Sequence, residues 1–189
     1  MISENLQKIS KDILEKINKS QSILIIAHVR PDGDAIGSVS GLYQALKTLK
    51  NKQVETALLD GIPERFSFGW PQNVVPIQEK EINSKHDLIL ILDSGDEERI
   101  GFKITRDIAK TCIVNIDHHA SNTNFGDINY VDITACSTCE IITQLINNFG
   151  INISEDIATS LMMGLITDSR CFQNEGIRPE MLIPKLLIS

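Results

Sequence analysis

Acidic and histidine side chains follow three apolar runs of this sequence, at the point where each run ends. The runs cover 22–27, 87–92 and 112–116. The side chains are His28, Asp32, Asp34, Asp93, Asp117, His118 and His119. Hydrophobic burial requires none of these residues, whereas carboxylates and imidazoles are ligands of divalent metal ions. The pattern therefore predicts a metal or phosphate site where the three runs end.

Four carboxylates in one place would repel one another strongly unless a cation lay among them. Mixed carboxylate and imidazole ligands suit manganese better than calcium, with zinc, iron or cobalt as alternatives. Seven candidate ligands are too many for one ion. A pair of ions about 3.5–4 Å apart, bridged by a carboxylate, would use them.

Alternating strands and helices would position these side chains. Apolar periodicity predicts helices over 6–17, 35–49, 137–150 and 154–169, with a short helix near 104–109 and a further one from 178. Apolar runs predict strands over 22–27, 54–59, 88–92 and 111–116. The crossovers are long enough for parallel pairing. We therefore expect an α/β fold with a mostly parallel, open sheet flanked by helices, in which ligands bind at the carboxyl ends of the strands.

Composition excludes several classes of function. A length of 189 residues suits one domain, and the formal net charge of −7 offers no basic stripe for long duplex nucleic acid. No stretch approaches the roughly 18 apolar residues of a membrane span, and residues 1–6 lack the layout of a secretory signal. We expect a cytoplasmic protein without membrane contact.

Cys136 and Cys139 are the closely spaced pair among four cysteines, and reduced thiols are favoured over a zinc site.

The order of the motifs resembles the DHH phosphoesterase family, within the RecJ-like superfamily. The matching segments are 28–35 (HVRPDGDA), 93–96 (DSGD), 117–119 (DHH), 121–132 (SNTNFGDINYVD) and 164–169 (GLITDS). The similarity is greater to the NrnA-like branch of bacterial oligoribonucleases, which also act as 3′-phosphoadenosine 5′-phosphate phosphatases. That branch hydrolyses short oligonucleotides, linear dinucleotides or 3′-phosphoadenosine 5′-phosphate.

The resemblance implies two divalent cations, most readily Mn²⁺, with Mg²⁺ or Co²⁺ as alternatives. It assigns one ion to His28, Asp32 and Asp93, and the second to Asp34, Asp93, His118 and Asp168. It gives the catalytic roles to His119, which would contact the scissile phosphate, and to Asp117, which would hold its neighbours in place.

Members of this family continue into a second, C-terminal domain that grips the substrate. The resemblance therefore identifies 1–189 as the DHH domain, ending near the expected interdomain linker, with the substrate-binding domain absent. One alternative is a weakly active or non-catalytic metal-binding domain that needs a partner domain. A further alternative is a RecJ-like single-strand exonuclease. A short oligonucleotide or nucleotide phosphate is the expected substrate, and a homodimer is left open.

Overall fold

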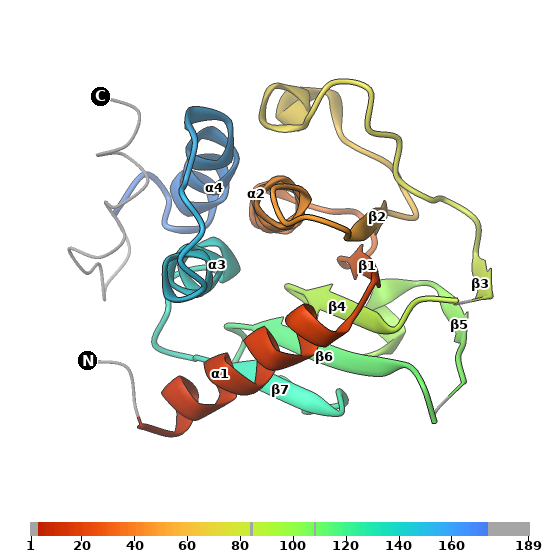
Figure 1. Cartoon of the computed structure of the whole chain (residues 1–189). Helices are drawn as coiled ribbons and strands as arrows, with labels where there is room; N and C mark the ends of the chain where they lie inside the picture. The colour runs from red at the N-terminus through yellow and green to blue at the C-terminus, as the bar shows by residue number, and fades with distance from the viewer. Residues whose placement is uncertain (1–3, 84, 108, 174–189) are drawn as a thin grey trace.

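A five-stranded sheet forms the centre of the computed structural model, which describes residues 4–83, 85–107 and 109–173. The strand order is β2-β1-β4-β6-β7, and every pairing is parallel (Figure 1). The strands are β1 (Ser22–Ile26), β2 (Gln53–Ala57), β4 (Leu88–Leu92), β6 (Cys112–Asp117) and β7 (Ile128–Val131). The predicted α/β fold with an open parallel sheet is confirmed.

Four helices cover one face of this sheet (Figure 1). They are α1 (Glu4–Lys19), α2 (Gly33–Lys47), α3 (Thr138–Asn148) and α4 (Glu155–Asp168). Their buried apolar side chains form one core with Ile23 and Ile25, the residues of β1 whose side chains point to this face. The sequence prediction of these helices is confirmed, with ends that differ by a few residues. The helix expected from 178 lies outside the described residues.

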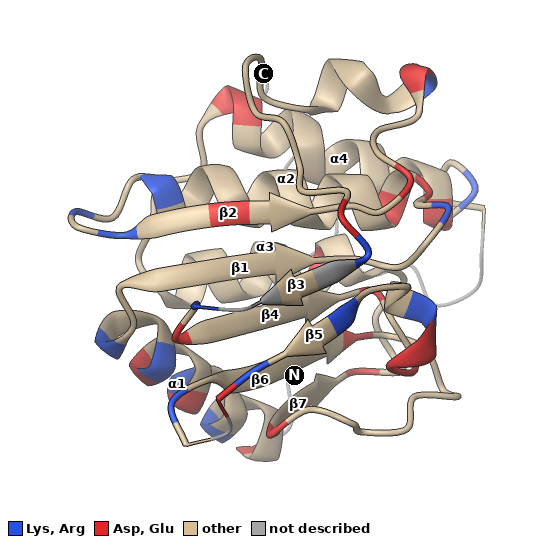
Figure 2. Ribbon diagram, turned by 90° about the vertical axis from the view of Figure 1, so that its right-hand side faces the viewer, with Lys and Arg blue, Asp and Glu red and all other residues tan. Residues whose placement is uncertain are grey.

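A smaller parallel sheet covers the opposite face. It consists of β3 (Glu81–Asn83) and β5 (Lys103–Thr105), which lie in front of the central sheet in Figure 2. Ile82 and Phe102 form a second core there with Leu24 and Ile26 of β1. The short helix expected near 104–109 is wrong, because β5 occupies its start. The central parallel sheet must be buried on this face as well, and the pairing of β5 with β3 over it outweighs a weak local helical pattern.

Helices α2 and α4 pack closely, and this contact holds the last turn of α4 over the sheet. Cβ atoms built at Gly37 and Gly164 would lie 2.5 Å from the Ser160 carbonyl oxygen and 2.3 Å from Cys139 Sγ. Both positions therefore require glycine.

Among the described residues, the helices are too short or too polar to span a membrane.

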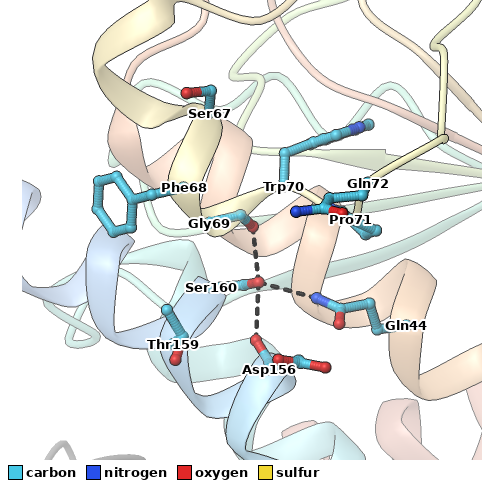
Figure 3. Close-up of a pocket in the computed structure, with 10 residues that line it drawn as sticks. All are labelled: Gln44, Ser67, Phe68, Gly69, Trp70, Pro71, Gln72, Asp156, Thr159 and Ser160. Carbon is cyan, nitrogen blue, oxygen red and sulfur yellow. Dashed lines mark hydrogen bonds between the residues drawn. The ribbon is translucent and has the colours of Figure 1, made fainter.

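A 3₁₀ helix, η1 (Glu64–Gly69), lies over the same helix pair. The Ser160 hydroxyl accepts a hydrogen bond from the Gln44 amide and lies 2.8 Å and 3.0 Å from the carbonyl oxygens of Gly69 and Asp156 (Figure 3). A cavity of about 430 Å³ lies between η1, α2 and α4. These hydrogen bonds line the cavity and join η1 to both helices.

We predict that Gly37→Ala destabilises the protein by about 1–3 kcal/mol, the usual effect of overpacking. Helix propensity alone would give the opposite sign, because alanine in a helix is favoured over glycine by about 1 kcal/mol. Chemical denaturation measures the difference. Gly95→Ala is the control, since its added Cβ would lie 3.6 Å from its nearest neighbour. Equal or greater stability of Gly37→Ala would contradict the close packing of α2 and α4.

Candidate metal centre

The ends of β1, β4 and β6 bring His28, Asp93 and His118 together, as the sequence predicts. Asp93 is only 1% exposed. One of its carboxylate oxygens, Oδ2, lies 3.4 Å from His28 Nε2, and the other, Oδ1, lies 3.8 Å from His118 Nε2. The two oxygens of one carboxylate thus face two different histidines. Acidic segments gather beyond the arrowheads of the strands in Figure 2.

On one side of Asp93, His28 and Asp32 complete a group of three candidate ligands. Asp32 Oδ1 lies 3.9 Å from His28 Nε2, and it also accepts hydrogen bonds from the first backbone N–H groups of α2. His28 Nδ1 lies 2.7 Å from the carbonyl oxygen of Val29, which leaves Nε2 to face the carboxylates. Burial opposes protonation of His28, but Asp93, Val29 and Asp32 together raise its pKa.

On the other side, Asp34 is buried against the N-terminus of α3. Its carboxylate accepts hydrogen bonds from the backbone N–H groups of Thr138 at 2.6 Å and Cys139 at 2.9 Å. Burial, followed by the neighbouring Asp93 and Asp168 carboxylates, raises the pKa of Asp34 well above its usual value, and Cys139 opposes this shift. The positive end of a helix therefore offsets part of the cost of this buried carboxylate.

Asp168 comes from the last turn of α4 and joins Asp34 and His118 in a second group of candidate ligands. Its Oδ2 lies 3.6 Å from His118 Nε2, which is also 3.9 Å from Asp34 Oδ2. Burial and then repulsion by Asp93 raise the pKa of Asp168, although His118 opposes them. The structure therefore brings together all six residues that the resemblance names as metal ligands.

The chemistry of this donor set fits divalent cations. The histidine-to-carboxylate separations of 3.4–3.9 Å are longer than the about 2.7–3.2 Å of most hydrogen bonds. They are close to the about 3.0–3.6 Å between two ligands that bind one ion at about 2.0–2.2 Å. The raised pKa values of Asp34 and Asp168 show that repulsion and burial disfavour their ionised forms. A bound cation would reverse that preference.

Asp117 and His119 form a pair beside the ligand groups. Asp117 Oδ1 lies 2.7 Å from His119 Nδ1, and Asp117 is fully buried. Burial raises the pKa of Asp117, but hydrogen bonds from His119 and Asn122 outweigh it and lower the pKa overall. The hydrogen bond to Asp117 in turn raises the pKa of His119. His119 also lies in a group with Asp93 and His118 that could hold an ion.

The sequence did not indicate that three residues contact this centre, or that a fourth supports one of them. Thr138 donates a hydrogen bond from Oγ1 to Asp93 Oδ1 at 3.1 Å, and Cys139 contacts Asp34. Asn122 donates a hydrogen bond to Asp117 Oδ2, and Asn115 accepts one from Asn122. The capping sequence that begins at Ser137 predicts the start of α3, but nothing in it indicates that this start faces Asp34.

All four cysteines are free, and burial, followed by Glu140, raises the pKa of Cys136 to about 12.

The geometry defines an open parallel α/β domain with a carboxylate and imidazole centre at the carboxyl edge of its sheet. A family model described as "DHH family, N-terminal domain" matches residues 22–165. The chain therefore belongs to the DHH family, and the resemblance drawn from the sequence motifs is confirmed.

Two curated relatives share the name "bifunctional oligoribonuclease and PAP phosphatase NrnA". The protein from Thermus thermophilus is 34% identical over 161 residues, which are 85% of this chain and 47% of that protein. A protein from Streptococcus mutans, whose name adds the word "probable", is 30% identical. The match covers 86% of this chain and 50% of that protein. The chain thus spans about half the length of these relatives.

A solved structure supports the fold. An exopolyphosphatase-related protein from Bacteroides fragilis superposes with a TM-score of 0.82 at 23% sequence identity. The match covers 96% of this chain and 56% of that protein.

We predict that Asp93→Asn abolishes the binding of both metal ions, whereas His28→Ala lowers the affinity chiefly for one of them. Asparagine tolerates the left-handed backbone of Asp93, with a φ of 55°, so the variant tests the carboxylate and not the turn. The loss should exceed the about 10–100-fold in affinity that removal of an outer partner costs. Calorimetric titration with Mn²⁺ measures it, with Asp12→Asn on α1 as the control. Two sites of full affinity in Asp93→Asn would refute the bridge.

Proposed function

We propose that this chain is a divalent-metal-dependent phosphoesterase that hydrolyses short oligonucleotides, linear dinucleotides or 3′-phosphoadenosine 5′-phosphate. The observation that carries the proposal is the position of Asp93 between His28 and His118, with one carboxylate oxygen toward each. Such a shared carboxylate is what a site for two neighbouring ions requires. The printed names of the relatives support the substrate class.

The proposal assigns six residues to the ions. His28, Asp32 and Asp93 would hold one ion, and Asp34, Asp93, His118 and Asp168 would hold the other. Mn²⁺ is the preferred ion because the donor set mixes imidazole nitrogen with carboxylate oxygen. When bound, two such ions acidify a water molecule and neutralise the charge of a phosphate group.

The residues of the chain supply orientation and electrostatics. Thr138 donates to Asp93 Oδ1 and the N-terminus of α3 holds Asp34, so both carboxylates are fixed before any ligand arrives. His119 is bound at Nδ1 by Asp117, which leaves Nε2 to contact a phosphoryl oxygen. A hydrogen-bond donor aimed at developing negative charge stabilises the transition state of phosphoryl transfer.

The acidic balance of the chain favours short substrates. Its formal net charge of −7 would repel a long polyanion, and neither a basic stripe nor counterion release is available to offset that repulsion. The attraction for phosphate in this proposal comes from the metal centre itself. A substrate with one or two phosphate groups can use that attraction fully.

We predict that the purified chain with Mn²⁺ releases mononucleotides from a linear dinucleotide, and that EDTA abolishes the reaction. The physical reason is that, in the proposed centre, the ions acidify the attacking water and neutralise the phosphate charge, so their removal by EDTA removes both effects. Chromatography of the products measures turnover, and Asp93→Asn distinguishes this centre from a contaminating enzyme. A parallel assay uses a long single strand. Degradation of the long strand without cleavage of the dinucleotide or of 3′-phosphoadenosine 5′-phosphate would overturn the proposal.

We further propose that the chain carries the metal centre while most of the substrate grip belongs to the part of the relatives that it does not match. We predict that fusion to that part of the Thermus thermophilus relative raises kcat/KM, chiefly by lowering KM. Remote contacts contribute binding energy that positions the reacting phosphate. Steady-state kinetics of the chain and the fusion measure the difference. Equal kcat/KM would show that residues 1–189 suffice for recognition.

A further inference from the structure

The side chain of Asn122 joins the Asp117–His119 pair to β6 and to the segment that follows β4. Its Nδ2 lies 2.7 Å from Asp117 Oδ2, on the opposite side of the carboxylate from His119. We propose that Asn122 is a positioning residue that fixes which carboxylate His119 pairs with. The role in turnover rests on the proposed function, whereas the effect on His119 does not.

His119 Nδ1 has a choice between two carboxylates. It lies 2.7 Å from Asp117 Oδ1 and 3.7 Å from Asp93 Oδ1. Pairing with Asp117 leaves His119 Nε2 for a phosphate. Pairing with Asp93 would instead draw His119 onto the carboxylate that His28 and His118 share. The position of Asp117 therefore decides whether His119 stands beside the metal ligands or among them.

The amide of Asn122 has one permitted orientation. Its Oδ1 accepts a hydrogen bond from the backbone N–H of Asn124 at 2.7 Å. A backbone N–H only donates, so the oxygen must face Asn124 and the NH₂ group must face the other way. That group meets Asp117 Oδ2, Asn115 Oδ1 at 2.7 Å and the carbonyl oxygen of Ser94 at 3.3 Å. Asp117 thus receives a donor that cannot be inverted.

The neighbours of Asn122 anchor it to the sheet. Asn115 lies in β6, is fully buried, and donates from Nδ2 to the carbonyl oxygen of Ser94 at 3.1 Å. Ser94 follows the shared carboxylate Asp93 directly. The chain of contacts therefore runs from the end of β4 through Asn115 and Asn122 to Asp117, and it ties the position of His119 to the position of Asp93.

Removal of the Asn122 donor would leave one oxygen of a fully buried carboxylate without this partner. An unpaired buried acceptor is costly, so Asp117 would shift or turn to find another donor. His119 would then lose its fixed distance from Asp117. The hydrogen-bond partners of the Asn122 side chain include none of the six proposed metal ligands. The affinity for metal should therefore change little.

The kinetic test uses Asn122→Ala and Asn122→Asp with Mn²⁺ and a linear dinucleotide. Asn122→Asp keeps the size and the acceptor for Asn124 but removes the donor to Asp117. Both variants should lower kcat by about 10–100-fold, the usual effect of losing such a partner, with Mn²⁺ affinity and KM nearly unchanged. Asn147→Ala, at an exposed position of α3, is the control. Full kcat in both variants would overturn the proposal.

A double-mutant cycle shows whether Asn122 acts through His119. In the His119→Ala background, Asn122→Ala should cause no further loss of kcat, because the residue that it positions is gone. Losses that multiply would show that Asn122 acts elsewhere and would overturn the positioning role.

A spectroscopic test does not need turnover. Long-range ¹⁵N–¹H spectra of the metal-free wild-type chain should show His119 protonated at Nδ1, the atom that faces Asp117. An unprotonated Nδ1 would overturn the proposal. If the wild-type chain hydrolyses no substrate but Nδ1 is protonated and becomes mixed in Asn122→Ala, the proposed function fails and the positioning role stands.

Discussion

Repulsion among buried carboxylates is the constraint on which the rest of this structure depends. Asp34, Asp93 and Asp168 gather around His118, and burial together with their mutual charge raises the pKa of Asp34 and Asp168. The fold supplies partial compensation in three forms: backbone N–H groups of α3 at Asp34, a hydroxyl donor from Thr138 at Asp93, and imidazole nitrogens between the carboxylates. None of these removes the negative charge, and a divalent cation would do so directly.

The order of the strands explains why Asp93 is the shared residue. It follows β4, which lies between β1 and β6 in the sheet. The end of a central strand reaches the ends of both neighbours, so Asp93 meets His28 on one side and His118 on the other. The left-handed backbone at Asp93, with a φ of 55°, turns the chain there at a conformational cost. Extensive hydrophobic burial of β4 on both faces holds the turn in place.

The sequence predicted the parts of this site that depend on strand ends. His28, Asp93 and His118 each follow an apolar run, and parallel pairing alone brings such positions to one edge. Asp168 was different, because it ends a helix, and only the resemblance to a family placed it in the site. The contacts of Thr138 and Asn122 were not predictable, since they depend on how α3 and a loop pack in three dimensions. β5 escaped prediction for the same reason, because its three residues pair with a distant segment.

Two adjacent histidines, His118 and His119, acquire different environments from their partners. Their rings lie 4.4 Å apart, yet the side chain of His118 is 14% exposed and that of His119 is 35% exposed. His118 Nε2 faces three carboxylates of the proposed metal ligands, whereas His119 Nδ1 faces Asp117. Identical side chains one residue apart therefore differ in access to solvent and in the nitrogen left for a ligand. The fold separates the two imidazoles through their different hydrogen-bond partners, although the residues are adjacent in the sequence. In the proposed function, this separation would allow one motif to serve both a metal and a phosphate.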